Sequence, residues 1–155
     1  KESMPKELFN KLIASKNFQS GMQSLRQIEF ALFDMLIHME TNPDNIDVIS
    51  TLESVRDEVA VVRPPHWNRF PHSFSHIFAG GYAAGYYSYK WAEVLSADVF
   101  EEFENNGVLS KDVGARFTRE ILSVGGSRSA KESFIKFKGR EPSVEALLRH
   151  NGLAA

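Results

Sequence analysis

Apolar residues recur at intervals of three and four along much of this 155-residue chain, and this spacing most constrains its fold. The pattern is clearest in one segment, where the apolar positions are Phe18, Met22, Leu25, Leu32, Leu36 and Met39. Side chains at this spacing share one face of an α-helix, whereas a half-buried strand alternates at every second residue. The spacing therefore predicts a central helix over residues 18–39.

Proline, asparagine, serine and glycine mark where further helices begin and end. Pro5 fits the first position of a helix that runs to about Ser15, because that position needs no helical N–H. The others are predicted from their caps and stops: a third capped by Asp47 and ended by Pro64-Pro65, a fourth from Tyr82 to about Phe103 before Asn105-Asn106-Gly107, one from Ser110 to Gly125-Gly126, one from Ser129 to Gly139, and one from Ser143 to Asn151-Gly152. We therefore predict an all-α fold, one compact multi-helix domain over residues 1–155, with an ordered, aromatic-rich loop between Arg63 and His72.

Composition narrows the classes of protein that this domain can belong to. The 18 lysines and arginines are scattered among 20 acids, so we expect no nucleic-acid partner. The chain has no cysteine and no apolar run near the ~20 residues of a membrane helix, which favours a cytoplasmic protein that does not bind membranes. It begins at Lys1 without an initiator methionine, and we interpret it as a fragment of a longer chain.

The common catalytic motifs are missing from the sequence. An HExxH zinc site places two histidines one helical turn apart beside a glutamate, and no such pentapeptide occurs. His72 and His76 have the spacing, but no glutamate follows His72, so we expect hydrogen-bonding or substrate contacts rather than metal ligation. A small metalloprotein built on these two histidines is a third, remote hypothesis. Nucleophilic catalysis lacks a cysteine or a Gly-x-Ser-x-Gly serine.

Tyrosines gather in one segment after a pair of glycines. On a helix starting near Tyr82, the residues Tyr82, Tyr86 and Tyr89 share one face and present their hydroxyls together. Such a stripe can simply pack in a core, although each buried hydroxyl would then need a partner. Gly80 and Gly81 before it form a hinge-like element that allows close approach of another backbone. This pattern suggests a surface for an extended peptide.

The string from Phe74 to Trp91, FSHIFAGGYAAGYYSYKW, resembles the thimet oligopeptidase family of zinc metallopeptidases, and within it the bacterial oligopeptidase A branch. The resemblance extends over almost the whole chain, including Gly125-Gly126-Ser127 and the segment from Phe137 to Pro142. It matches the C-terminal part of such enzymes, whose HExxH helix lies upstream. It implies a mostly helical zinc endopeptidase that cleaves short peptides in a channel, with this chain as one wall.

The resemblance also implies roles for individual residues. Tyr89 would donate to the oxyanion of the peptide carbonyl and Tyr82 would orient the substrate backbone. The substrate contacts would be His76, Gly80, Gly81 and Tyr86. Zinc would belong to the full-length enzyme and none to this chain, which we expect to be inactive without the N-terminal catalytic portion.

The competing hypothesis is a self-standing helical interaction module whose partner groove is formed by Trp67, Phe70 and the tyrosines. Under the peptidase hypothesis, the surface around residues 63–89 would be apolar enough to cause self-association or disorder. An upstream HExxH in the same reading frame would distinguish the two. Sequence reasoning does not separate endopeptidase from dipeptidyl-carboxypeptidase action.

Overall fold

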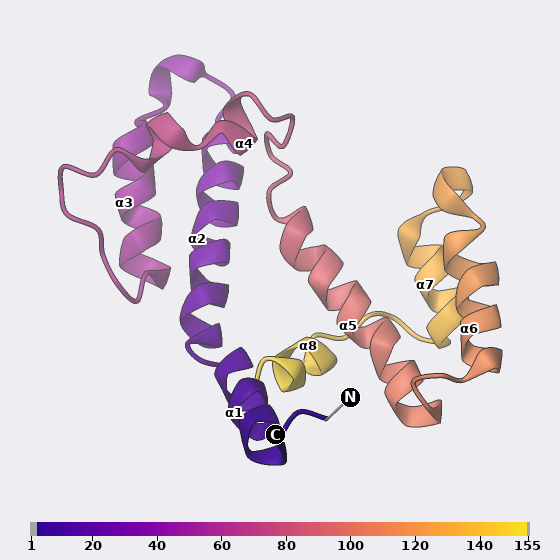
Figure 1. The fold of residues 1–155 in the computed structure, drawn as a ribbon. Helices are drawn as coiled ribbons and strands as arrows, with labels where there is room; N and C mark the ends of the chain where they lie inside the picture. Colours follow the sequence, from indigo (N-terminus) through magenta and orange to yellow (C-terminus); the bar gives the residue numbers. More distant parts are fainter. Residues whose placement is uncertain (1–2, 155) are drawn as a thin grey trace. The chain divides into compact units, whose positions relative to one another are not determined.

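The computed structural model describes residues 3–154, and within that range it contains helices, turns and no strand (Figure 1). The all-α prediction is confirmed. The chain consists of two compact units, each with most of its contacts between its own residues. The first unit ends at Lys90 and the second begins at Trp91. The single domain over residues 1–155 stays a prediction. Among the described residues, no helix is long and apolar enough to cross a lipid bilayer.

Two long helices form the frame of the first unit. Its elements are α1 (Lys6–Lys16), α2 (Ser20–Met39), the 3-10 turn η1 (Pro43–Asn45), α3 (Val48–Val59), the 3-10 turn η2 (Phe70–Ser73) and the short α4 (Ser75–Phe78). α2 and α3 lie side by side (Figure 1). Asp47 caps α3 as predicted, because its Oδ1 accepts from the Ser50 amide at 3.0 Å.

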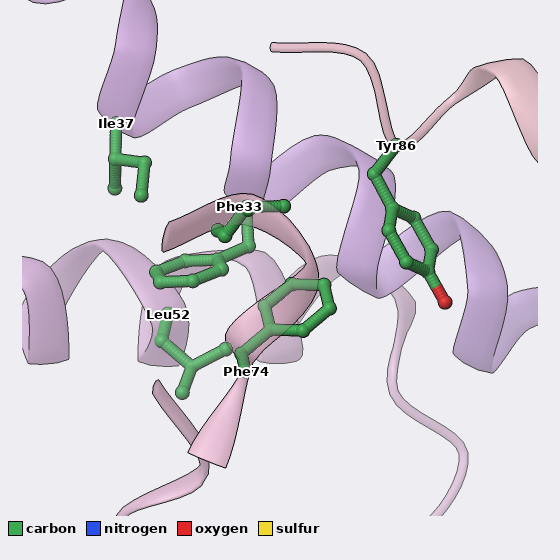
Figure 2. Packing of buried hydrophobic residues seen from close by; sticks show 6 residues of the cluster. Phe33, Ile37, Leu52, Phe74 and Tyr86 are labelled. Carbon is green, nitrogen blue, oxygen red and sulfur yellow. The ribbon is translucent and has the colours of Figure 1, made fainter. Parts of the chain in front are cut away.

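The core of the first unit lies where these two helices meet the segment around α4. Phe33 of α2, Leu52 of α3 and Phe74 point toward one another there (Figure 2). Ile37, Ile77 and Tyr86 complete the buried cluster. Burial of such side chains contributes roughly 1.5–3 kcal/mol each. The segment that precedes the glycine pair is therefore fixed to the long helices by its own apolar residues.

The loop between Arg63 and His72 is attached to both long helices. Phe70 stacks on Phe30 of α2 with ring centroids 4.6 Å apart. The buried Arg56 of α3 donates to Glu29 of α2 at 3.0 Å and to Asn68 of the loop at 3.2 Å. Charge-assisted hydrogen bonds of this kind are stronger than neutral ones, so they compensate the burial of Glu29 and Arg56.

The second unit consists of shorter helices. α5 (Ser88–Asn106) begins in the first unit and continues into the second, and is followed by α6 (Lys111–Phe117), the π-helix η3 (Thr118–Leu122), the 3-10 turn η4 (Gly125–Ser127), α7 (Ala130–Lys138) and α8 (Glu145–His150). The predicted caps Ser110 and Ser129 accept from the Val113 and Glu132 amides. Phe134 and Phe137 of α7 are buried.

A buried carboxylate ties the end of this unit to α5. Both oxygens of Asp98 accept from Arg140, at 2.7 and 2.6 Å, and the Ser143 amide donates to the same group at 2.8 Å. Burial alone would raise the pKa of Asp98, but these hydrogen bonds outweigh it and leave the pKa below its ordinary value. Asp98 therefore stays ionised and anchors the segment that leads into α8.

Several helix boundaries differ from the prediction. α2 begins at Ser20 rather than Phe18, and α3 ends at Val59, before Val62 and the proline pair. The largest error concerns the tyrosine segment, where α5 begins at Ser88 rather than Tyr82 and residues 83–87 form turns. The reason for this late start is a set of hydrogen bonds at the candidate site.

Two glycines of the second unit should respond in opposite ways to substitution by alanine. Gly114 lies inside α6, and an added Cβ would meet nothing within 4 Å. Gly139 ends α7 with a left-handed φ of +80°, which costs an alanine about 1–2 kcal/mol. We expect Gly114→Ala to raise the free energy of unfolding by roughly 0.5–1 kcal/mol and Gly139→Ala to lower it. Denaturant unfolding of each variant measures both, and shifts of the same sign would contradict the assignment.

Candidate functional site

The glycine pair leaves α4 through a tightly bonded turn. The Gly80 amide donates to the Ser75 carbonyl at 2.7 Å, and the Tyr82 amide donates to the His76 carbonyl at 3.0 Å. A Cβ on Gly80 would lie 2.9 Å from that His76 carbonyl oxygen, so glycine is needed for packing against α4. Gly81 has a φ of +78° and open space around it. Only Gly81 thus leaves room on the solvent side for another chain.

Residues 82–87 form a turn rather than the first turn of a helix. In a helix that began at Tyr82, the Tyr86 amide would bond to the Tyr82 carbonyl and the Ala84 amide would have no helical partner. Here both donate to Asp34 of α2, the Ala84 amide to Oδ1 and the Tyr86 amide to Oδ2, each at 2.9 Å. Ala84 also has a φ of +55°, outside the helical region. The predicted helical face of tyrosines is therefore wrong in its geometry.

The tyrosines converge nonetheless, around His76. The Tyr82 and Tyr89 rings have centroids 5.2 Å apart, and the Tyr86 and Tyr89 rings 5.1 Å. The His76 ring lies 6.2 Å from Tyr82, 5.8 Å from Tyr86 and 6.3 Å from Tyr89. Four of the residues named from the sequence thus form one cluster, which we call the tyrosine cluster: His76, Tyr82, Tyr86 and Tyr89.

The members of the tyrosine cluster differ in exposure. Tyr82 and Tyr89 are 39% and 40% exposed, whereas Tyr86 is 8% exposed. The Tyr86 hydroxyl donates to Gln27 Oε1 of α2 at 2.8 Å, which satisfies it in the interior. Tyr86 was expected to contact the substrate, but its side chain is buried in the core (Figure 2). Two phenols, Tyr82 and Tyr89, are open to a ligand.

Hydrogen bonding favours the protonated form of Tyr89. The hydrogen bond with Tyr82 raises the pKa of Tyr89 above its ordinary value, and partial desolvation adds to it. Desolvation likewise raises the pKa of Tyr86, against the opposing charge of Arg26. Because an unperturbed tyrosine titrates near 10, both phenols carry their protons at neutral pH. Tyr89 is therefore a hydrogen-bond donor under ordinary conditions.

The described residues do not form a zinc site. Across residues 3–154, no group of three or more His, Asp or Glu side chains is placed to hold a metal ion. A catalytic zinc needs three protein ligands beside its open position. His72 in η2 and His76 in α4 are both exposed, and no such group includes them.

A separate cavity of about 540 Å³ lies in the second unit. Its described lining is apolar apart from Ser96 and Ser133, with Phe100, Phe103 and Phe117 among the aromatic side chains. None of the described lining residues is charged or carries a titratable carboxylate or imidazole. The cavity lacks the groups that acid-base or metal chemistry requires.

The comparisons with known proteins identify the family of the chain. The sequence profile of peptidase family M3 matches residues 1–153, so the chain belongs to that family. It is similar to oligopeptidase A of Escherichia coli (strain K12), with 51% identity over 153 residues that cover 98% of this chain and 22% of the relative.

More distant relatives cover the chain to the same extent. Probable cytosolic oligopeptidase A of Arabidopsis thaliana is 48% identical over 159 residues, covering 99% of this chain and 23% of the relative. Dipeptidyl carboxypeptidase of Escherichia coli (strain K12) is 33% identical over 156 residues, covering 97% and 22%. The chain thus spans about a fifth of the length of these relatives. Since both an oligopeptidase and a carboxypeptidase match, the likeness fixes a peptidase family and not one mode of cleavage.

Sequence reasoning missed the residues that support the site from α2. Gln27 and Asp34 contact the tyrosine segment more than fifty residues further along the chain. The signal for Asp34 was its place beside Phe33 in an apolar stretch, where a lone carboxylate requires a partner. His38 lies beside the same carboxylate, and its Nδ1 is 2.7 Å from the Asp34 carbonyl oxygen and 2.9 Å from Oδ1.

The raised pKa values give a test by alkaline titration of this chain. We expect Tyr82→Phe to lower the pKa of Tyr89 toward about 10, because it removes the bond that favours the neutral phenol.

Tyr86 gives a second test. Its contribution to stability is complete below a pH of about 10 and is lost as the pH rises through its folded pKa, so Tyr86→Phe should make the free energy of unfolding fall less steeply with rising pH. Tyrosinate absorbance and unfolding at several pH values measure these effects. Tyr87→Phe is the control. An unchanged pKa of Tyr89 in the Tyr82→Phe variant would contradict the hydrogen bond between the two phenols.

Proposed function

We propose that this chain is the substrate-facing part of a zinc-dependent oligopeptidase that hydrolyses short peptides. The activity belongs to the proposal because the chain spans only 22% of the length of oligopeptidase A. The observation that carries it is the pair of exposed phenols, Tyr82 and Tyr89, held with ring centroids 5.2 Å apart beside His76. Membership in peptidase family M3 supplies the class of reaction.

In this proposal Tyr89 stabilises the developing charge on the substrate. When the peptide carbonyl becomes tetrahedral, its oxygen gains negative charge, and a preorganised donor at about 2.7–3.1 Å lowers the barrier. Tyr89 fits because its raised pKa keeps the hydroxyl protonated. Its proton now engages Tyr82, and an arriving carbonyl oxygen would take the place of the Tyr82 oxygen. Tyr82 accepts in this pair, so its own hydroxyl proton is available to donate to the substrate backbone and orient it.

The remaining site residues divide between contact and support. His76 is exposed and shares the tyrosine cluster, so it can contact the same substrate. Gly81 has open space around it and would let an extended peptide approach, whereas Gly80 is needed against α4. Tyr86 is buried, so in the described structure it supports the ring of Tyr89 from behind. We therefore keep His76 and Gly81 as proposed contacts and assign the hydrogen-bond chemistry to Tyr82 and Tyr89.

The partners of the chain follow from what it lacks. Its described residues form no three-ligand metal group, so the zinc would be held by the N-terminal catalytic portion of the same enzyme. We propose no nucleic-acid or membrane partner. The cytoplasm is the proposed compartment, and it is supported by the name of the probable cytosolic oligopeptidase A, although another relative is named as organellar.

One observation favours the interaction-module hypothesis. Trp67 is largely exposed, and α1 carries an apolar face with no buried residue between Lys6 and Lys16. Phe70, however, is half-buried and stacks on Phe30. The same exposed surfaces also fit a chain that packs against the rest of a peptidase. A reading frame that contains an upstream HExxH would exclude the self-standing module.

The role of Tyr89 can be tested in the intact peptidase. We expect Tyr89→Phe to lower kcat by about 10²-fold, as for removal of one oxyanion donor, with zinc content unchanged. Steady-state kinetics on a quenched peptide measures this. Tyr87→Phe, at a half-exposed neighbour outside the tyrosine cluster, is the matched control and should retain kcat. An undiminished kcat in Tyr89→Phe would refute the assignment.

The need for the remainder of the enzyme can be tested with this chain alone. We expect no turnover of a quenched peptide when zinc is added, because no described group of side chains can hold the metal in a catalytic geometry. A time course with and without a chelator measures any activity. Chelator-sensitive turnover by the chain would disprove the proposed division of labour.

A further inference from the structure

We propose that Asp34 of α2 is a positioning residue that holds Tyr82 and Tyr89 in their catalytic arrangement. The inference rests on the proposed function, because it assigns a purpose to the geometry of that same site. Asp34 is fully buried and accepts two backbone hydrogen bonds from the segment between the two tyrosines. No contact with substrate is assigned to it, so it would act through the tyrosines.

The carboxylate fixes the turn through both of its oxygens. Oδ1 accepts from the Ala84 amide and Oδ2 from the Tyr86 amide, each at 2.9 Å. Hydrogen bonds to a charged acceptor contribute about 1.5–3 kcal/mol each, which is enough to maintain the unfavourable φ of +55° at Ala84. The turn conformation therefore depends on an acceptor that lies in a different helix.

The conformation of this turn also sets the spacing of the two exposed phenols, Tyr82 and Tyr89. The Gly85 amide donates to the Tyr82 carbonyl at 2.8 Å, and the Tyr89 amide donates to the Tyr86 carbonyl at 3.2 Å. Both tyrosines are thus bonded to residues within or next to the pair that Asp34 holds. In a helix the rise from Tyr82 to Tyr89 would be about 10 Å, so a release of the turn into a helix would leave the two tyrosines on one face but move their rings apart.

A second contact from α2 supports the same arrangement. Gln27 lies seven residues before Asp34, on the same face of the helix, and accepts from the Tyr86 hydroxyl at 2.8 Å. The Tyr86 ring packs against Tyr89 at 5.1 Å. Asp34 therefore holds the backbone of the turn while Gln27 holds the ring behind Tyr89.

His38 completes the environment of the carboxylate. Its Nδ1 faces two acceptors, the Asp34 carbonyl oxygen and Oδ1, so this nitrogen must carry a proton. An amide in place of the carboxylate would direct its NH₂ group at a backbone N–H or at His38. Asparagine at position 34 therefore loses one acceptor and adds a repulsive donor pair, although it has almost the same shape.

The test uses Asp34→Asn in the intact peptidase. We expect kcat to fall by about 10²-fold, because a small misplacement of a catalytic group can cost that much, with zinc content unchanged. The decisive measurement is the same substitution in a Tyr89→Phe background. If Asp34 acts through Tyr89, it should cause little further loss of kcat there.

Each result separates the possibilities. An unchanged kcat in Asp34→Asn, or an equal loss in both backgrounds, would overturn the positioning role. If Tyr89→Phe itself retains kcat, the proposed function of Tyr89 fails instead. Asp47→Asn is the matched control, because Asp47 also accepts a backbone N–H but at the start of α3, and it should retain kcat.

Gln27→Leu keeps the inference testable if Asp34→Asn does not fold. It removes the acceptor of the Tyr86 hydroxyl and leaves the carboxylate in place. We expect it to lower kcat about 10-fold when Tyr89 is present and hardly at all in the Tyr89→Phe background. Equal effects in the two backgrounds would overturn the proposal, as would no effect in either.

Discussion

The buried carboxylate of Asp34 determines the geometry of the candidate site more than any other group. It is buried on α2, next in sequence to Phe33 of the apolar cluster, and accepts from two amides about fifty residues away in sequence. A buried carboxylate is stable only when its oxygens are satisfied, so the turn and the helix stabilise one another. The shape of the segment that bears Tyr82 and Tyr89 follows from this pairing.

Much of the fold could be predicted from local signals. The caps Asp47, Ser110 and Ser129 and the stop at Gly139 act within a few residues, and they lie where the sequence indicated. The start of α5 was wrong because it depends on a partner distant in sequence. The spacing of the tyrosines indicated a helix through residues 82–87, whereas two of the amides in this segment donate to the acceptor on α2 and the chain turns there.

The candidate site was predictable in composition and not in arrangement. The resemblance named Tyr82, Tyr89 and His76, and the structure brings their rings together, but through a turn rather than a helical face. The spacing pattern gave Tyr86 the same role as Tyr82 and Tyr89, although its side chain is buried. Its hydroxyl has an interior acceptor in Gln27, which no spacing within the tyrosine segment could indicate.

The anchoring of the turn by backbone amides has a consequence for exchanging segments between peptidases of this family. The side chains of Ala84 and Gly85 take no part in the bonds to Asp34, so their identities could diverge while the anchor persists. Consider a chimera that receives only residues 82–89, in a scaffold without an acidic side chain at the matching position of α2. It would carry both phenols but lack the carboxylate that fixes the turn. The transferable module is the turn together with its helix.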